Sequence, residues 1–340
     1  MDHLIAQWGR VILGGGALDR KGALDIVAAA RCVPHDLFYW ANRVRQAHFG
    51  NSVRLCSIIA GKLGACAEDC KWCAQSLAWM KGGSQTVSHP PRQGLEKPQC
   101  AGVEEILSAT SQAATRGATC MGIVNSGRRP GPRDIETVTA AARSISSQPD
   151  ASIRISASLG EITEDQARQL ASAGVHRYHH NLETSRRMFG QMVSTHSYDD
   201  RLATLVAARS AGMSVCSGGI FGIGENWEDR IDLALTLRDQ VRPDTVPINF
   251  LSPIPGTPLE NTPPLEPMEL LTIVAMFRLI LPRCDIKVAG GRQANLRDLQ
   301  SWMFYAGASG CMVGNYLTTS GREVEQDLQM IRDLGLDVMQ

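Results

Sequence analysis

Short apolar runs alternate with amphipathic stretches along the chain from about residue 53 onward. The apolar runs are typical of buried parallel strands and cover residues 53–60, 118–124, 152–158, 174–179, 213–220, 244–250, 284–289 and 309–313. The stretches between them have helical patterns and cover residues 103–116, 134–146, 163–173, 198–211, 226–239, 267–280 and 294–306. This alternation predicts an α/β fold, a closed (β/α)8 barrel of the TIM type.

The rest of the chain flanks the predicted barrel. Residues 1–52 are expected to form an N-terminal helical extension, residues 53–320 the barrel, and residues 321–340 a C-terminal helical tail. Residues 80–101 are rich in Gly, Pro and polar residues without periodicity, which predicts an exposed loop.

One helix of the barrel has clear boundary signals. Thr163 stands before Glu164 and Asp165, which is typical of an N-cap followed by an acidic first turn. Gly174 then predicts the end of that helix.

The charge balance narrows the class of partner. Lys plus Arg equals Asp plus Glu at 34 each, so the net charge gives no indication of binding to nucleic acid or to a membrane surface. A small neutral or mildly charged substrate is expected. No apolar run approaches the ~20 residues that span a bilayer, and the first residues do not have a signal-peptide pattern. We therefore expect a cytoplasmic protein, in which the ten cysteines act as ligands and buried thiols rather than in disulfides.

Three cysteines lie close together directly after the first predicted strand. Cys66, Cys70 and Cys73 have the spacing Cys-x3-Cys-x2-Cys. Three thiolates from one loop leave one iron of a 4Fe-4S cluster without a protein ligand, so that iron can bind a second molecule. A zinc knot is the alternative, but structural zinc takes four ligands and no matching second pair is found.

This motif resembles the signature of the radical S-adenosylmethionine (SAM) superfamily, including the aromatic Trp72 before the last cysteine. In that superfamily the open iron chelates SAM, and reductive cleavage gives a 5'-deoxyadenosyl radical. The string Gly218-Gly219-Ile220-Phe221-Gly222-Ile223-Gly224-Glu225 resembles a second superfamily motif, which follows the fifth strand. The resemblance implies that the SAM site includes Trp72, Gly218, Gly219, Ile220, Gly222 and Glu225.

Within the superfamily, the chain from about residue 50 onward resembles the biotin synthase family, whose members insert sulfur into dethiobiotin. Ordered matches include the strings 64–76, 180–185, 215–220, 246–249, 256–259 and 289–292. The resemblance implies that Glu183 binds the SAM ribose and that Asn181 and Asn249 bind the ureido ring of dethiobiotin. Side-chain amides both donate and accept, which suits a cyclic urea. The alternative for each asparagine is a turn or core hydrogen bond.

Most members of the family hold a second, sulfur-donating 2Fe-2S cluster on three cysteines and one arginine inside the barrel. Cys120 and Cys216 match two of those cysteines, whereas Ser156 stands at the third position and Lys287 at the arginine position. Serine is a poor ligand for iron-sulfur clusters. The usual ligand set therefore cannot form unchanged.

Cys56 on the first strand offers a replacement ligand. In a closed eight-stranded barrel the first strand neighbours the second and the eighth, and inward positions alternate along each strand. We hypothesise that Cys56, Cys120 and Cys216 hold an auxiliary iron-sulfur cluster, 2Fe-2S or larger, with Lys287 nearby. The alternative is that the three are buried thiols.

The expected activity follows from these resemblances. The cofactors supply the difficult chemistry, so no protein acid or base is assigned. A one-electron donor such as flavodoxin or ferredoxin and a homodimeric state are implied by the resemblance. Two alternatives remain open: another radical SAM barrel enzyme, such as a mutase or a metal-cofactor maturase, and a noncatalytic iron-sulfur redox sensor.

Overall fold

The computed structural model describes residues 2–81, 95–148, 153–317 and 321–339. Its strands are β1 (Ser52–Leu63), β2 (Gln99–Cys100), β3 (Cys120–Asn125), β4 (Arg154–Ser158), β5 (Val175–His179), β6 (Ser214–Cys216), β7 (Gly219–Phe221), β8 (Thr245–Phe250), β9 (Asp285–Val288), β10 (Gly310–Met312) and β11 (Asp337–Val338). Most of the loop predicted at 80–101 lies outside the described residues, and its end forms β2, which pairs antiparallel with β1.

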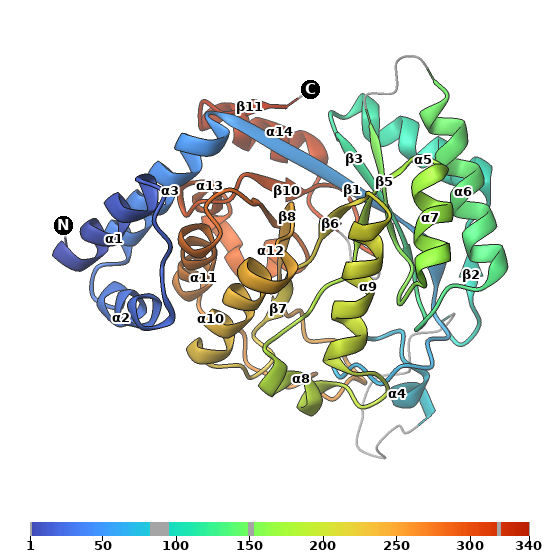
Figure 1. Ribbon diagram of the computed structural model, residues 1–340, viewed down its shortest axis with the longest axis horizontal. Helices are drawn as coiled ribbons and strands as arrows, with labels where there is room; N and C mark the ends of the chain where they lie inside the picture. The colour runs from blue at the N-terminus through green and yellow to red at the C-terminus, as the bar shows by residue number, and fades with distance from the viewer. Residues whose placement is uncertain (1, 82–94, 149–152, 318–320, 340) are drawn as a thin grey trace.

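The parallel strands close into a barrel, as predicted. The order runs β1, β3, β4, β5, β6, β8, β9 and β10, and β10 pairs with β1 to complete the circle. Figure 1 shows helices arranged around these strands. The carboxyl ends of the strands therefore meet at one end of the barrel, where barrel enzymes place their active sites.

The helices include all those predicted in the barrel, the last of them broken, and two short helices at residues 77–81 and 186–192 that were not predicted. They are α1 (His3–Leu13), α2 (Arg20–Ala30), α3 (Pro34–Phe49), α4 (Leu77–Lys81), α5 (Val103–Thr115), α6 (Pro132–Ser146), α7 (Glu164–Ser172), α8 (Arg186–Met192), α9 (Tyr198–Ser210), α10 (Trp227–Thr236), α11 (Pro267–Ile280), α12 (Arg292–Leu296), α13 (Trp302–Tyr305) and α14 (Val324–Asp333). The helix predicted at 294–306 is broken into α12, a 3-10 turn and α13, because Arg297 adopts a left-handed φ of 51°. The C-terminal tail ends in β11, which pairs with β1, so it is not helical throughout.

The predicted limits of α7 are confirmed. The Thr163 side chain accepts a hydrogen bond from the backbone N–H of Gln166, and the Gln166 side chain accepts one from the backbone N–H of Thr163. Gly174 has a φ of 95°, which L-residues rarely adopt.

The strand predicted at 213–220 is interrupted between β6 and β7. A Cβ atom at Gly218 would lie 1.9 Å from the carbonyl oxygen of Pro247. The backbone here leaves the ladder and instead donates from the Gly218 N–H to Asn181 and accepts from the Glu183 N–H. This break brings residues 181–183 against residues 218–225, which we call the glycine segment.

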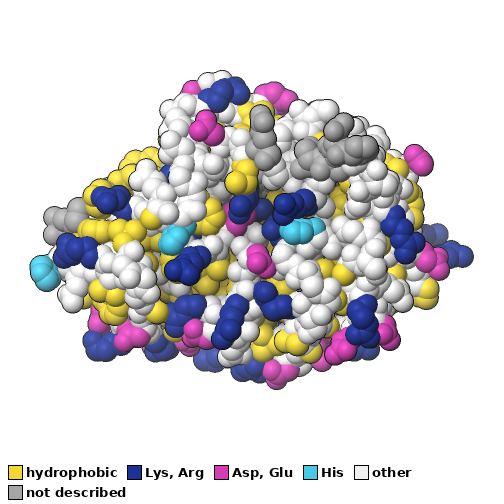
Figure 2. Space-filling model, turned by 45° about the horizontal axis from the view of Figure 1, so that its top comes forward, with side chains coloured by type: hydrophobic (Ala, Val, Ile, Leu, Met, Phe, Trp, Pro, Cys, Tyr) yellow, Lys and Arg dark blue, Asp and Glu magenta, His cyan; other side chains and the backbone are white. Residues whose placement is uncertain are grey.

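The outer layer includes one almost fully buried helix. Residues Leu270 to Ile280 of α11 are all buried, and α11 packs against α3 of the N-terminal extension. Figure 2 shows basic and acidic side chains interspersed over one face of the molecule, in keeping with the equal totals in the sequence. Among the described residues, no helix has both the length and the apolar character that a membrane span needs.

Candidate functional site

The loop after β1 is held in a compact conformation by its own backbone. Cys66 donates its N–H to the Gln75 carbonyl at 3.0 Å, and Cys73 donates its N–H to the Cys70 carbonyl at 3.0 Å. The Trp79 indole N–H donates to the Cys70 carbonyl at 3.0 Å. These bonds bring the three predicted cluster cysteines onto one tight loop.

The donor chemistry of this loop suits an iron-sulfur cluster. Burial raises the pKa of Cys73 to about 11 and also raises the pKa of Cys70, so both thiols must lose a proton when a metal binds. Within the described ranges, no three His, Cys, Asp or Glu side chains form a site for a single metal ion. A cluster spaces its cysteines more widely than one ion does, because each cysteine binds a different iron.

Two cavities open on the inner side of this loop. One, of about 360 Å³, extends from Trp72 and Cys73 down the barrel to Cys56, Cys120 and Cys216. The other, of about 270 Å³, is lined by all three loop cysteines. Both are also lined by Trp72, Cys73, Gln75, Val124, Ser158, His179, Asn181 and Glu183. The loop cysteines and the barrel cysteines therefore face connected space.

Glu183 lies at the junction of the two cavities in a strained conformation. Its φ of 69° is left-handed, which is unusual for a residue other than glycine. Burial raises the pKa of its carboxyl group, opposed by the guanidinium of Arg201 at 3.7 Å. A residue that adopts a rare backbone conformation and points its carboxylate into a cavity is typical of a functional site.

The glycine segment supports Glu183 through the backbone. A Cβ atom at Gly219 would lie 2.5 Å from the Glu183 carbonyl oxygen, so glycine is required for this close approach. The Ile220 N–H donates to the same carbonyl at 2.8 Å. Of the predicted SAM residues in this segment, Ile220 lines the larger cavity, whereas Gly218, Gly219, Gly222 and Glu225 line neither cavity.

The Glu225 carboxylate binds its own turn. It accepts from the backbone N–H of Gly222 at 2.9 Å and of Ile223 at 2.8 Å, and from Arg230 Nε at 2.9 Å. Its carboxylate therefore shapes the glycine turn.

Asn181 and Asn249 both line the larger cavity and both bind backbone. Asn181 Oδ1 accepts from the Gly218 N–H at 3.0 Å. Asn249 Oδ1 accepts from the Gly290 N–H at 2.9 Å, and its Nδ2 donates to the Gly219 carbonyl at 3.1 Å. Because a side-chain amide has two donor hydrogens and two acceptor lone pairs, each asparagine keeps capacity for a ligand.

The barrel cysteines gather around Lys287. Cys56 and Cys120 are register partners on β1 and β3. Lys287 Nζ donates to Cys56 Sγ at 2.7 Å, and it lies 3.3 Å from the Asp285 carboxylate. The hydrogen bond from Cys120 and the charge of Lys287 outweigh burial and lower the pKa of Cys56 to about 5. Burial raises the pKa of Cys216 to about 12.

The other buried cysteine of the barrel wall does not face this space. Cys311 on β10 is buried, and it is absent from the lining of both cavities. Ser156, which stands at a family cysteine position, does line the larger cavity. The inner end of the larger cavity thus brings together the three barrel thiols, Ser156 and the ammonium group of Lys287.

Three residues that were not among the predicted site residues also face the cavities. Arg177 and His179 on β5 line the larger cavity, and Arg201 on α9 lines the smaller one. His179 Nδ1 lies 3.2 Å from Cys216 Sγ, and burial lowers the pKa of His179 to about 4. Arg177 and His179 could have been found from the alternation of side chains along β5, in which Tyr178 is buried against the outer layer.

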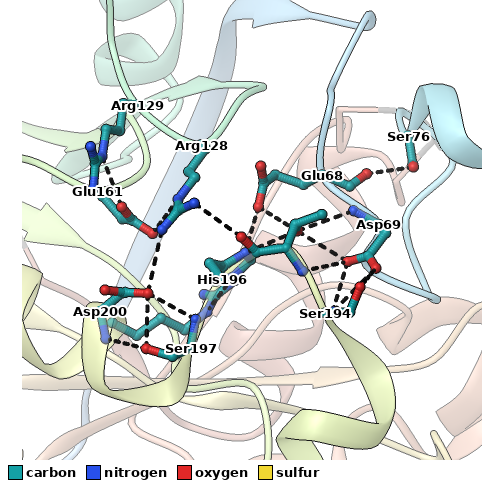
Figure 3. Close-up of polar contacts among 12 residues, drawn as sticks. Glu68, Asp69, Ser76, Arg128, Arg129, Glu161, Ser194, His196, Ser197 and Asp200 are labelled. Carbon is teal, nitrogen blue, oxygen red and sulfur yellow. Dashed lines mark hydrogen bonds and ion pairs between the residues drawn. The ribbon is translucent and has the colours of Figure 1, made fainter.

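A polar network ties the cysteine loop to the α8–α9 connection (Figure 3). Glu68 accepts from Thr195 Oγ1 at 2.6 Å and contacts His196 Nδ1 at 2.5 Å, and the Asp69 carboxylate accepts from the Ser194 N–H at 2.9 Å. Arg201 Nε donates to His196 Nε2 at 3.1 Å. Through Arg201 this network reaches Glu183, so it couples the position of the loop to the cavity junction.

Family models match most of the chain. The radical SAM superfamily matches residues 63–237, and the Biotin and Thiamin Synthesis associated domain matches residues 247–337. Among solved structures, methylornithine synthase has a TM-score of 0.79 at 20% identity, covering 98% of this chain and 97% of that one. The FeFe-hydrogenase maturase HydG from Carboxydothermus hydrogenoformans has a TM-score of 0.76 at 18% identity, covering 98% and 78%. At such identities these likenesses show the fold alone.

Relatives of known name are much more similar in sequence. The chain is 47% identical over 326 residues to a biotin synthase of Trichlorobacter lovleyi, covering 96% of this chain and 93% of the relative. It is 46% identical over 340 residues to a biotin synthase of Heliobacterium modesticaldum, covering 99% of each. Identity and coverage at this level, together with the two family models, make the chain a member of the radical SAM superfamily and, within it, of the biotin synthase family.

Proposed function

We propose that this protein is a radical SAM sulfurtransferase that converts dethiobiotin to biotin. The observation that carries the proposal is the larger cavity, which runs without interruption from Trp72 and Cys73 to the thiols of Cys56, Cys120 and Cys216. A substrate held in this cavity has the cysteine loop on one side and the barrel cysteines on the other. Sulfur insertion into a carbon skeleton needs both groups within reach of one substrate.

The residues near the loop have a consistent set of proposed roles. Cys66, Cys70 and Cys73 would hold the 4Fe-4S cluster, and Trp72, Glu183 and Ile220 would contact SAM. Gly218, Gly219, Gly222 and Glu225 would act indirectly, because they shape the backbone on which Ile220 and Glu183 rest. When bound, the cluster and SAM supply the reductive radical chemistry.

Asn181 and Asn249 are the proposed substrate contacts. Their amide groups line the cavity and are oriented by the bonds to Gly218 and Gly290. Oriented amides bind a neutral urea without placing an unpaired charge in the cavity.

Cys56, Cys120 and Cys216 are the proposed ligands of the auxiliary, sulfur-donating cluster. The ammonium group of Lys287, only 5% exposed, would balance the charge of that cluster. The bound cluster would supply the sulfur that enters the product. The surrounding barrel wall would limit the access of water to this space, which would protect carbon radicals.

The remaining assignments rest on the resemblance to the family. A one-electron donor of the flavodoxin or ferredoxin type, a homodimer and a cytoplasmic location would complete the system. We also propose the division into an extension (1–52), a barrel (53–320) and a tail (321–340). A mutase or maturase activity is not favoured, since the relatives at 44–47% identity are biotin synthases.

The test is anaerobic reconstitution with iron and sulfide, followed by a product assay with SAM, a reductant and dethiobiotin. Cys56→Ser should retain SAM cleavage and lose biotin formation. Cys311→Ser is the matched control, because Cys311 is buried but lines neither cavity, and it should form biotin. Release of 5'-deoxyadenosine without biotin from the wild type would refute the proposed substrate.

A further inference from the structure

Arg177 places a second cation among the barrel cysteines. It lies on β5, where its register partners are Ser156 on β4 and Ser214 on β6. Its side chain is partly buried and lines the larger cavity together with Cys56, Cys120 and Cys216. Lys287 approaches the same thiols from β9, on another part of the barrel wall.

The guanidinium of Arg177 has few partners in the protein. A guanidinium has five N–H donors, and within the described part of the chain Arg177 makes one hydrogen bond, from Nε to Ser214 Oγ at 3.1 Å. No carboxylate there lies within ion-pair distance of it, whereas Lys287 is paired with Asp285. Burial lowers the pKa of Arg177, but it is outweighed by the negative charges that the three barrel cysteines carry as thiolates and by the charge of Asp285, so the pKa is raised.

The neighbouring cation on β4 is arranged differently. Arg154 is exposed and donates from Nη1 to His176 Nε2 at 3.1 Å. It lines neither cavity. Arg177 is therefore a cation turned toward the thiols, and Arg154 is a solvent-facing cation on the adjacent strand.

We propose that Arg177 binds the auxiliary cluster directly, through hydrogen bonds from its guanidinium to the cluster's sulfide. This inference rests on the proposed function and deepens it, because it adds a residue to the site of the sulfur-donating group. Thiolate ligands and sulfides make such a cluster an anionic acceptor of hydrogen bonds. A planar fork of donors suits an acceptor that has several sulfur atoms.

Arg177 and Lys287 differ in the hydrogen-bond donors that they can offer to a cluster. Lys287 is a single-point donor that already contacts Cys56, whereas Arg177 has donors left over for atoms that the protein does not supply. Hydrogen bonds and positive charge near the sulfur atoms also raise the reduction potential of a cluster. Loss of Arg177 should therefore weaken retention of the cluster and lower its potential.

The experiment uses the full-length chain with Cys66, Cys70 and Cys73 replaced by Ala, so that bound iron and sulfide report on the barrel cluster alone. After anaerobic reconstitution, iron release to a ferrous chelator is timed, and the midpoint potential is measured by a spectroscopic titration. Arg177→Gln should release iron about 10-fold faster or more, the range typical for groups that support metal ligands, and should shift the potential downward. Arg177→Lys should restore part of both properties, and Arg154→Gln should behave as the parent does.

Several outcomes would overturn the inference. The inference fails if Arg177→Gln releases iron at the parent's rate and has the parent's midpoint potential. It also fails if Arg154→Gln changes both properties as much as Arg177→Gln does. The same substitutions, made in the chain that keeps its loop cysteines, should leave SAM cleavage intact. Loss of SAM cleavage would contradict a role of Arg177 confined to the auxiliary cluster. If the parent binds no second cluster at all, the proposed sulfur source fails as well, whereas a failure confined to Arg177→Gln leaves the proposed function standing.

Discussion

The glycine at position 218 offers a sharp test of how the site is built. Adding one methyl group there places a Cβ atom 1.9 Å from the Pro247 carbonyl oxygen, which is backbone and cannot rotate away. The two segments must separate, and the hydrogen bonds that Gly218 makes with Asn181 and Glu183 lie on the moving segment. Glycine is required here because of the close approach, since 218 is not among the positions with a left-handed φ.

The magnitude can be worked out against a matched variant. In Gly218→Ala, overpacking should lower the unfolding free energy by about 1–3 kcal/mol. The reduced conformational freedom of the unfolded chain should raise it by up to about 1 kcal/mol. Gly190→Ala adds the same methyl group to α8, where the new atom meets nothing within 4 Å. It should stabilise the protein by about 0.5–1 kcal/mol. We therefore expect unfolding free energies that differ by about 1–3 kcal/mol between the two variants.

Urea denaturation of the metal-free protein measures this difference, read from the transition midpoint at a constant slope. Gly218→Ala should also bind SAM more weakly after reconstitution, because Glu183 moves with the segment. A Gly218→Ala protein as stable as Gly190→Ala would refute the reasoning, since the contact with the Pro247 carbonyl would then impose no strain.

Three further predictions concern buried charges. Hydrogen bonds outweigh burial and hold the pKa of Asp229 below its usual value, so Asp229→Asn should lower the unfolding free energy by about 1.5–3 kcal/mol above pH of about 5. That difference should shrink as pH falls below the ordinary carboxyl pKa of about 4, which denaturation curves across pH will show. Arg292→Gln should cost about 3–5 kcal/mol, because it leaves Asp327 of α14 buried without its 2.6 Å partner; calorimetry is the measure, and a loss under about 1 kcal/mol would contradict it. Glu225→Gln should lower stability by about 1.5–3 kcal/mol yet weaken SAM binding less than Glu183→Gln does, since Glu225 lines neither cavity; the reverse order in binding titrations would show a direct contact.

Features encoded by short-range spacing could be predicted from the sequence. The closed barrel follows from alternating patterns, and the limits of α7 follow from Thr163 and Gly174. The cysteine loop is similarly local, because its spacing places three thiols on one turn whatever the rest of the chain does.

Features that depend on contacts between distant strands could not be predicted. The break between β6 and β7 arises from the approach of Pro247, which lies 29 residues after Gly218 in the sequence. Alternation along β5 predicts that Arg177 points inward, but the thiols that it faces lie on other strands, so their proximity depends on how the barrel closes. The Glu225 carboxylate resembles a cofactor contact in the motif, and only the folded turn reveals that it binds backbone N–H groups.

The measurement that tests the account most directly follows the sulfur atom itself. The chain is reconstituted with isotopically heavy sulfide, freed of unbound sulfide, and given SAM, reductant and dethiobiotin for one turnover, and the mass of the product is determined. Biotin that has gained the heavy sulfur in the wild type, with none formed by Cys56→Ser, is the predicted result. Biotin with sulfur of natural mass, or undiminished heavy biotin from Cys56→Ser, would contradict the claim that the barrel cysteines hold the sulfur-donating group.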